Sequence, residues 1–351
     1  MVWKMFLQRI TALVCYSLIA ASTIKPSHLW ANETTIDSNA VVFAYHRIGE
    51  KGYPTTNVTI EQFKAHLEEL QTGNYSILPL PQIINSIKTG KRLPYRTIGI
   101  TFDDAYQSVY TRAWPLLRAK GFPFTIFVST DAIDNKFNKF MSWNQIQELT
   151  NAGITLGSHT GSHLHMPKET LKINMEEIRR SHERFMEIFN KKPNIFAYPY
   201  GETSLKIKSM IKKIGFIAAF GQHSGAFDKS SDFYNLPRFS MNEKYAGIKR
   251  FKLAANTLAM QVTDVTPMDP FLKTDASPAL GFTLKSKFKN FKQLSCFLSH
   301  NGKARIEILG NKRIEIRFNK PFPLGRTRLN CTHPGIGGRW HWFGRQFYRP
   351  N

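Results

Sequence analysis

The feature that most constrains the fold is a regular alternation of short apolar runs with amphipathic segments, which continues to about residue 240. The apolar runs predict buried strands at residues 40–48, 97–102, 122–130, 153–159, 194–201 and 215–221. The amphipathic segments predict helices at residues 59–73, 143–153 and 169–190. Strands and helices in alternation, with uniformly apolar strands, predict a mainly parallel sheet covered by helices, either a barrel or an open doubly wound sheet. In both, functional residues gather at the carboxyl ends of the strands.

The composition changes after about residue 260. Residues 259–281 are rich in Pro, Asp and Thr, which predicts a linker. Beyond it, residues 305–309 and 313–318 alternate apolar and polar side chains on either side of a short turn, which is typical of a β-hairpin. From Phe282 to Asn351 there are 15 Lys and Arg residues against two acids. We therefore expect a small, basic, β-rich module over residues 282–351.

The first 31 residues predict a secretory signal peptide. Lys4 and Arg9 lie near an apolar stretch of about a dozen residues, and no acid occurs before Glu33. This stretch is too short for a membrane-spanning helix of about 20 residues. An ordinary buried N-terminal helix is the alternative. We expect cleavage near Ala31, with Ala21 as the poorer alternative site. We also expect an exported protein that is periplasmic or secreted, and no transmembrane helix once the signal is removed.

Charge and cysteine content limit the classes of binding partner and the cellular compartment that fit this chain. The formal charge of +23 falls to +20 when the three cations Lys4, Arg9 and Lys25 leave with the signal. A strongly basic exported protein favours acidic envelope polymers, phosphorylated lipids or anionic membrane surfaces. Nucleic acid is disfavoured because the basic residues are dispersed and no recognition motif accompanies them. Cys296 and Cys331 remain, and the sequence leaves open whether they pair or stay as buried thiols.

Two adjacent carboxylates, Asp103 and Asp104, follow the apolar run at residues 97–102. Neighbouring side chains in a regular strand point to opposite faces, so the pair can share a pocket only where the strand has ended and the backbone turns. An Asp at a strand-to-helix junction also commonly caps the helix. The pair alone therefore leaves a capping role and a functional role open.

A histidine pair follows another apolar run, at residues 153–159. His159 and His163 are four residues apart, a spacing that places both rings on one side of a helical turn. Two imidazoles and a carboxylate are a usual ligand set for a catalytic Zn²⁺ that keeps an open position for water. His165 is interpreted as a core or surface residue. Both polar clusters follow strands, as a site at one rim of a sheet requires.

Three motifs in order, TFDDAY, SHTGSH and FAYPYG, make the chain resemble the polysaccharide deacetylase family with NodB homology, carbohydrate esterase family four. The segments AYHRI and LPRFSM are similar to elements of the branch that includes poly-N-acetylglucosamine deacetylases. The resemblance extends over about residues 41–256. It implies an α/β fold, a deformed (β/α) barrel of the NodB-homology type over residues 40–258, followed by the small C-terminal β-rich module. The tail is similar to a C-terminal module of some bacterial members.

The resemblance also implies roles for individual residues. Asp104, His159 and His163 match the metal triad, so the expected cofactor is one divalent metal ion, with Zn²⁺ the first choice. Asp103 matches the general base. This division is chemically sound because a carboxylate bound to a cation loses basicity, and its unbound neighbour must accept the proton of the attacking water. The backbone N–H of Tyr200 is implied as an oxyanion donor.

One family element lacks a clear counterpart, the late Leu-x-His motif that protonates the leaving amine. The LSH triplet that ends at His300 lies in the presumed second module and is interpreted as a coincidence. His46 and His223 are the other candidates, each also readable as a loop or core histidine, so the general acid stays unassigned. Arg238 is a candidate to orient the base, and Trp143 a candidate wall of the acetyl or sugar pocket; both also fit packing roles.

Three functions remain open at the level of sequence. The expected one is a metal-dependent hydrolase that removes acetyl groups from an N-acetylated polysaccharide of the cell envelope. The alternatives are a weakly active or inactive member that binds glycan, and a charge-driven binder of envelope polymer or nucleic acid. The sequence does not choose among poly-N-acetylglucosamine, peptidoglycan and chitin-like polymers, or between N-acetyl and O-acetyl groups.

The aromatic tail RWHWFGRQFY has two interpretations. Aromatic faces beside arginines suit sugar stacking and contact with anionic polymers. Alternatively, the aromatic residues form one buried face of a terminal strand, because Trp340 and Trp342 share a face at a spacing of two.

Overall fold

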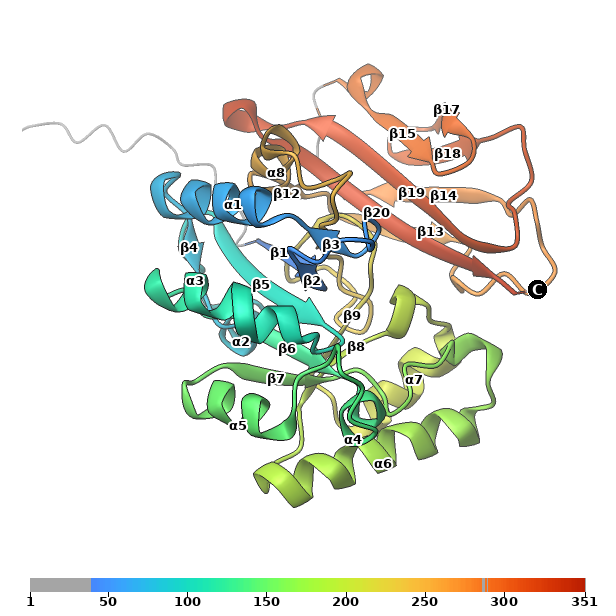
Figure 1. Ribbon diagram of the computed structural model, residues 1–351. Helices are drawn as coiled ribbons and strands as arrows, with labels where there is room; N and C mark the ends of the chain where they lie inside the picture. The colour runs from blue at the N-terminus through green and yellow to red at the C-terminus, as the bar shows by residue number, and fades with distance from the viewer. Residues whose placement is uncertain (1–38, 286–287, 289, 351) are drawn as a thin grey trace, which may run out of the picture. The chain divides into compact units, whose positions relative to one another are not determined.

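The computed structural model describes residues 39–285, 288 and 290–350. The predicted signal peptide, residues 1–31, lies outside these residues and stays a prediction. Within the described part of the chain, no helix combines the length and apolar character needed to cross a membrane. The described residues belong to one compact unit (Figure 1).

A mainly parallel sheet of nine strands carries the N-terminal part of this unit. All six predicted strands are present in it. Its main path, in spatial order, is β10 (Ala226–Phe227), β1 (Ala40–Tyr45), β5 (Thr97–Asp103), β6 (Thr125–Val128), β7 (Thr155–Ser158), β8 (Ile195–Ala197) and β9 (Ala218–Phe220). Two short strands lie off the path: β4 (Ser76–Ile77) pairs with β5, and β11 (Phe239–Ser240) pairs with β1. The order does not close on itself among the described strands, so the structure is the expected deformed, incomplete (β/α) barrel.

Helices connect successive strands and cover the sheet, as Figure 1 shows. They are α1 (Ile60–Thr72), α2 (Leu80–Lys88), α3 (Trp114–Ala119), α4 (Thr130–Asp134), α5 (Trp143–Asn151), α6 (Leu171–Phe189), α7 (Leu205–Ile214) and α8 (Ile248–Ala255). Helix α1 begins where the sequence predicts, because Thr59 and Gln62 form a reciprocal capping box. The three helices predicted from their spacing are α1, α5 and α6.

Interlocked aromatic rings fix the central strands against the helices. Tyr45 of β1 packs edge-on against Phe63 of α1 and stacks on Phe102 of β5, both at 5.4 Å between ring centroids. Phe43 stacks on Phe251 of α8 at 4.4 Å. Each such burial contributes about 1.5–3 kcal/mol. This packing holds the carboxyl end of β5, where the acid pair lies, in a rigid setting.

The C-terminal part is β-rich, as predicted. One sheet has the order β12 (Leu258–Ala259), β20 (Trp340–Arg349), β19 (Gly325–Pro334), β15 (Ser295–Leu298) and β16 (Gly302–Lys303). The other has the order β13 (Val262–Thr266), β14 (Leu280–Leu284), β18 (Arg313–Arg317) and β17 (Arg305–Leu309). Strands β17 and β18 form the predicted hairpin. Cys296 and Cys331 lie opposite each other on β15 and β19 and form a disulfide, which settles the alternative that the sequence left open.

The segment predicted as a linker, residues 259–281, contains strand structure. It contains β13, which pairs with β14, and it begins within β12, which pairs with β20 of the module. The segment reads as a linker because its strand residues are only partly buried and lack a continuous apolar face. The domain boundaries themselves stay predictions.

The tail aromatics serve mainly as packing residues. Phe347 and Tyr348 of β20 are buried, and Trp342 packs edge-on against Phe239 at 5.1 Å. Trp340 differs, with 36% of its surface exposed. The interpretation of a buried strand face therefore describes most of the tail, and Trp340 alone among these residues offers a broad aromatic surface to solvent.

Candidate metal centre and active site

The acid pair lies where the backbone leaves the sheet. Strand β5 ends at Asp103, and Asp104 and Ala105 then adopt left-handed conformations with φ of 71° and 60°. Non-glycine residues pay a conformational cost in this region, and such strain clusters at functional sites. The turn allows two consecutive carboxylates to be buried side by side, which a regular strand forbids.

The predicted metal triad comes together around Asp104. The Nε2 atoms of His159 and His163 lie 3.4 and 3.2 Å from Asp104 Oδ1. Asp104 Oδ1 and His159 Nε2 are buried and have no hydrogen-bond partner among the residues that the structure describes. Buried polar atoms are rarely left unsatisfied. A divalent cation between these donors accounts for both atoms, so the residues present fit the metal that the sequence implies.

The protonation states at the triad also fit a metal. His159 Nδ1 lies 2.7 Å from the carbonyl oxygen of Ala197, so Nδ1–H donates there and Nε2 is the ligand atom. Burial lowers the pKa of His163 to about 4, which keeps this imidazole neutral. Burial opposes ionisation of Asp104, but contacts with His159 and His163 hold its pKa well below the usual range. A neutral imidazole and an ionised carboxylate are the forms that bind metal.

The pKa of His159 depends on burial and on the two neighbouring carboxylates. Burial lowers that pKa, but Asp104 and Asp103 together raise it above the ordinary value for histidine. The two carboxylates thus favour positive charge at the position of Nε2. A bound divalent cation would supply the same charge without a proton.

Asp103 is held apart from the triad by Arg238. The guanidinium makes two hydrogen bonds to the carboxylate, at 2.7 and 2.8 Å, and both side chains are fully buried. Arg238 also donates to the carbonyl oxygen of Gly221 and to Thr101 Oγ1, at 3.0 and 3.1 Å. Burial alone would raise the pKa of the Asp103 carboxyl. The positive charge of Arg238, followed by that of His159 and His46, more than offsets burial and holds this pKa below its ordinary value. The carboxylate is therefore ionised and fixed in direction, and Arg238 occupies the position predicted for it.

Two further predicted residues border the acid pair. His46 Nε2 lies 3.9 Å from Asp103 Oδ2, and His46 Nδ1 is buried without a hydrogen-bond partner in the described chain. Tyr200, in a short turn after β8, has φ of 58°, and its ring lies edge-on to His163 at 4.5 Å. The motifs after β1, β5, β7 and β8 thus meet at one rim of the sheet.

Trp143, His300 and His223 are the remaining candidates. Trp143 packs on Phe185 and Phe189 of α6, and its indole N–H donates to Asp134 at 2.7 Å, so it serves as a packing residue. His300 is exposed between β15 and β16 in the module, as the interpretation of LSH as a coincidence requires. Burial lowers the pKa of His223 to about 3, so it is neutral at ordinary pH and a poor proton donor.

Several residues of the site escaped the sequence analysis. Thr101 had a usable signal, because it lies two residues before Asp103 and so shares its face of β5. His165 and Glu202 had none: Glu202 is buried and lies 2.7 Å from His165 Nδ1, while the His165 ring stacks on Tyr200 at 4.0 Å. The carbonyl of Ala197 selects the tautomer of His159. It is a backbone group, so a sequence motif cannot predict its role.

Comparisons with known proteins agree with this geometry. The family model of polysaccharide deacetylase matches residues 90–219. The poly-beta-1,6-N-acetyl-D-glucosamine N-deacetylase of Staphylococcus epidermidis is 28% identical over 262 residues, which cover 65% of this chain and 90% of that protein. The enzyme of the same name from Escherichia coli K12 is 26% identical over 64% of this chain and 40% of its own length. Among solved structures, a Streptococcus pyogenes deacetylase in complex with acetate matches with a TM-score of 0.58 and 16% identity, covering 62% of this chain and 99% of that one.

The fold, the Asp-His-His group and the matched family model agree with one another. Together they support a polysaccharide deacetylase, the family whose model matches residues 90–219 of the chain.

Proposed function

We propose that the protein is a metal-dependent hydrolase that removes acetyl groups from an N-acetylated polysaccharide. The observation that carries this proposal is the division of labour between adjacent carboxylates. Asp104 faces His159 and His163, and its Oδ1 and His159 Nε2 have no hydrogen-bond partner in the described chain, whereas Asp103 is held by Arg238 and kept ionised. One acid is thus arranged to bind a cation, and the other is arranged to accept a proton.

The residues of the chain divide the hydrolysis among them. Asp104, His159 and His163 would hold the metal, which when bound supplies Lewis acidity toward water and the acetyl carbonyl. Asp103 accepts a proton from the water whose oxygen attacks the carbonyl carbon. Arg238 keeps the accepting oxygens of Asp103 in place through its paired hydrogen bonds. When the carbon–nitrogen bond breaks, the amine must gain a proton as acetate leaves.

His46 is the proposed donor of that proton. It lies 3.9 Å from Asp103, next to the acid that has just accepted a proton, and its Nδ1 is free of protein partners in the described chain. The Tyr200 N–H is the proposed donor to the oxyanion, because this residue packs against His163 and its strained backbone turns at the rim of the site.

Poly-N-acetylglucosamine is the proposed substrate. Support comes from the relatives named poly-beta-1,6-N-acetyl-D-glucosamine N-deacetylase. The test is acetate release from a panel of poly-N-acetylglucosamine, chitin oligomers, peptidoglycan and O-acetylated xylan, with a chelator-treated sample as the control. Release from the first polymer alone, lost with chelation, is the expected result. Release only from O-acetylated xylan would identify a carbohydrate esterase, and binding without release would identify an inactive glycan-binding member.

The metal is proposed to be Zn²⁺, because two imidazoles and one carboxylate with an open position are a usual catalytic zinc set. Purified protein should contain close to one metal ion per chain by elemental analysis. His159→Ala should lose it, since this residue supplies a buried ligand atom. His300→Ala, which changes an exposed histidine of the module, is the matched control and should keep the metal. Stoichiometric metal in His159→Ala would remove His159 from the site.

Export is proposed on two grounds. The predicted signal peptide at residues 1–31 is one, and the disulfide between Cys296 and Cys331 is the other, because disulfides persist in oxidising compartments. Fractionation of expressing cells, with mass determination of the mature chain, tests the proposal. Full-length protein in the cytoplasm would contradict it.

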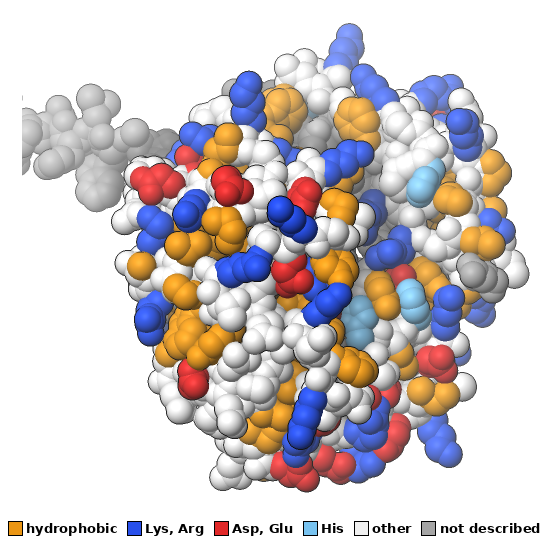
Figure 2. Space-filling view, viewed as in Figure 1, with side chains coloured by type: hydrophobic (Ala, Val, Ile, Leu, Met, Phe, Trp, Pro, Cys, Tyr) orange, Lys and Arg blue, Asp and Glu red, His pale blue; other side chains and the backbone are white. Residues whose placement is uncertain are grey.

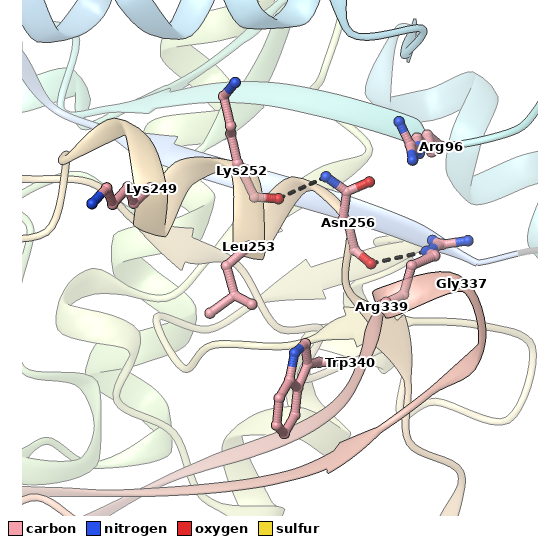
Figure 3. A pocket seen from close by; sticks show the side chains of 9 residues that line it. Arg96, Lys249, Lys252, Leu253, Asn256, Gly337, Arg339 and Trp340 are labelled. Atoms are coloured by element: carbon pink, nitrogen blue, oxygen red, sulfur yellow. Dashed lines mark hydrogen bonds between the residues drawn. The ribbon is translucent and has the colours of Figure 1, made fainter.

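An anionic polymer is the proposed partner of the basic C-terminal module. Figure 2 shows Lys and Arg side chains dispersed over the face in view, so general charge does not define a single site. A more specific feature is a pocket of about 370 Å³ where α8 meets the start of β20. Figure 3 shows the side chains that line it. Arg339 and the exposed Trp340 line it from the module, and Arg96 and Lys249 line it from the barrel. Cations beside an aromatic face suit an anionic sugar.

Charge reversal at this pocket should weaken binding of dextran sulfate. Lys249→Glu is expected to lower the affinity roughly fivefold, or about 1 kcal/mol, with a smaller effect at high salt. Lys312→Glu, in the exposed turn between β17 and β18, makes the same charge change away from the pocket and is the control. Neutral dextran separates charge from sugar recognition. Equal losses in both variants would leave the pocket without a special role.

A further inference from the structure

The C-terminal module contacts the loop that carries the proposed oxyanion donor. Gln346, on β20, is only 4% exposed, and its Nε2 donates to the carbonyl oxygen of Tyr200 at 2.9 Å. The sequence separation of these two residues is 146. A residue in a module without an assigned role therefore holds the backbone at the edge of the candidate active site.

The direction of the Gln346 amide is fixed by a second residue. Arg328, on the neighbouring strand β19, donates from Nε to Gln346 Oε1 at 3.1 Å. A guanidinium can only donate, so the oxygen of the amide must face Arg328 and its NH₂ group must face Tyr200. Because β19 and β20 are paired, with Arg328 opposite Gln346, this relay is rigid.

Tyr200 needs such support. Its φ of 58° is unusual for a residue with a side chain, and conformations of this kind persist only where the surroundings determine them. On the N-terminal side, the pyrrolidine ring of Pro199 fixes the backbone angle φ of that residue. On the C-terminal side, Gln346 fixes the peptide that carries the Tyr200 carbonyl. Together the two restraints set the direction in which the Tyr200 N–H points.

Other contacts from the module reach the same loop. Arg326 Nε lies 3.7 Å from Glu202 Oε1, and its guanidinium lies 5.5 Å from the centre of the Tyr200 ring. Strand β20 also approaches the barrel very closely at Gly344, where a Cβ atom would lie 1.9 Å from the carbonyl oxygen of Ser224. Gly344 and Gln346 share a face of β20. Glycine at position 344 thus lets the strand sit close enough for Gln346 to reach Tyr200.

We propose that Gln346, oriented by Arg328, is a positioning residue for deacetylation, and that the β19–β20 hairpin is part of the active site. It acts through Tyr200 and does not touch the reacting atoms. The inference rests on the proposed function, since it assigns the Tyr200 N–H to the oxyanion of acetyl transfer to water.

Two substitutions separate positioning from simple packing. Gln346→Met keeps the length of the side chain and removes both hydrogen bonds. Gln346→Glu keeps the bond from Arg328 and strengthens it with charge, but a carboxylate cannot donate to the Tyr200 carbonyl. Both variants are expected to lower kcat about tenfold on N-acetylglucosamine oligomers, with KM changed less than twofold, because loss of a direct oxyanion donor costs about a hundredfold or more. If Gln346 only anchored the hairpin, Gln346→Glu would behave as the wild type.

A second readout does not depend on the loaded enzyme. Hydrogen exchange of metal-free protein, followed by mass spectrometry of peptides spanning residues 199–203, should be faster in both variants. Asn330→Leu is the matched control, because it removes the 3.0 Å bond from Trp342 within the same hairpin without touching Tyr200. It should leave kcat and exchange at residues 199–203 unchanged.

The outcomes decide the proposal in each case. Wild-type kcat in Gln346→Glu, or losses equal to those of Asn330→Leu, would overturn it. If the wild type released acetate from no glycan, the proposed function would fail, and unchanged exchange at residues 199–203 would then separately overturn the positioning of Tyr200 by Gln346.

Discussion

Asp103→Asn should lower the turnover of acetylated glycan on the order of a hundredfold or more, and should leave the metal content unchanged. An amide cannot accept the proton of the attacking water, so the general base is lost. The metal triad keeps its three ligand residues, because Asp103 contacts Arg238 and not the unsatisfied atoms of the triad. Acetate release and elemental analysis of the same preparation measure the two effects together.

The Asp103 variant also leaves the Arg238 guanidinium buried without a counter-charge, so folding must be checked beside activity. The assay should be run well below the measured Tm of the variant. Asp232→Asn is the control, because Asp232 forms a half-exposed ion pair with Lys208 and should keep full turnover when substituted. Full activity in folded Asp103→Asn would remove Asp103 from the role of general base.

The barrel and the metal triad were predictable from sequence for physical reasons. Strands buried on both faces must be uniformly apolar, so the run at residues 97–102 is visible without any partner. The chemistry follows from position, because Asp104 and His159 come directly after β5 and β7, and parallel strands end at the same rim. The left-handed backbone at Asp104 explains how both acids face the site. This conformation could not be predicted from the residue types in the sequence.

The contribution of the C-terminal part was not predictable in this way. Residues 259–281 have the composition of a linker because β13 is half-exposed and needs no strong apolar pattern. The contact of Gln346 with Tyr200 joins residues 146 positions apart, and a single glutamine within an aromatic strand carries no signal of such a partner. The spacing of Trp340 and Trp342 predicts a strand face, but whether the face meets the barrel or solvent depends on tertiary packing. Local patterns therefore specify the elements, and only the fold specifies the contacts between the barrel and the module.

Arg238→Met should lower the free energy of unfolding by about 3–5 kcal/mol, because it leaves the Asp103 carboxylate buried without a cation. The two side chains are fully buried and share two hydrogen bonds, so neither can turn to water when its partner is lost. Urea unfolding at neutral pH measures the loss. Arg184→Met is the matched control: Arg184 pairs with Asp134 and Glu187 at the surface, and its loss should cost less than about 1 kcal/mol.

The pH dependence gives this prediction a second test. In the wild type the pKa of Asp103 is held below its ordinary value, so the ion pair contributes stability above the unfolded pKa and loses it as the pH falls through the folded one. Without Arg238, burial dominates and the pKa of Asp103 rises, so protonation at lower pH relieves the unpaired charge. The stability difference between wild type and Arg238→Met should therefore be largest near neutral pH and should narrow toward pH 4.

The double variant Asp103→Asn/Arg238→Met should lose less stability than the sum of the single variants, because it leaves no buried charge unpaired. A constant difference across pH, with additive losses, would show that Arg238 stabilises the protein by packing alone and does not hold Asp103 ionised.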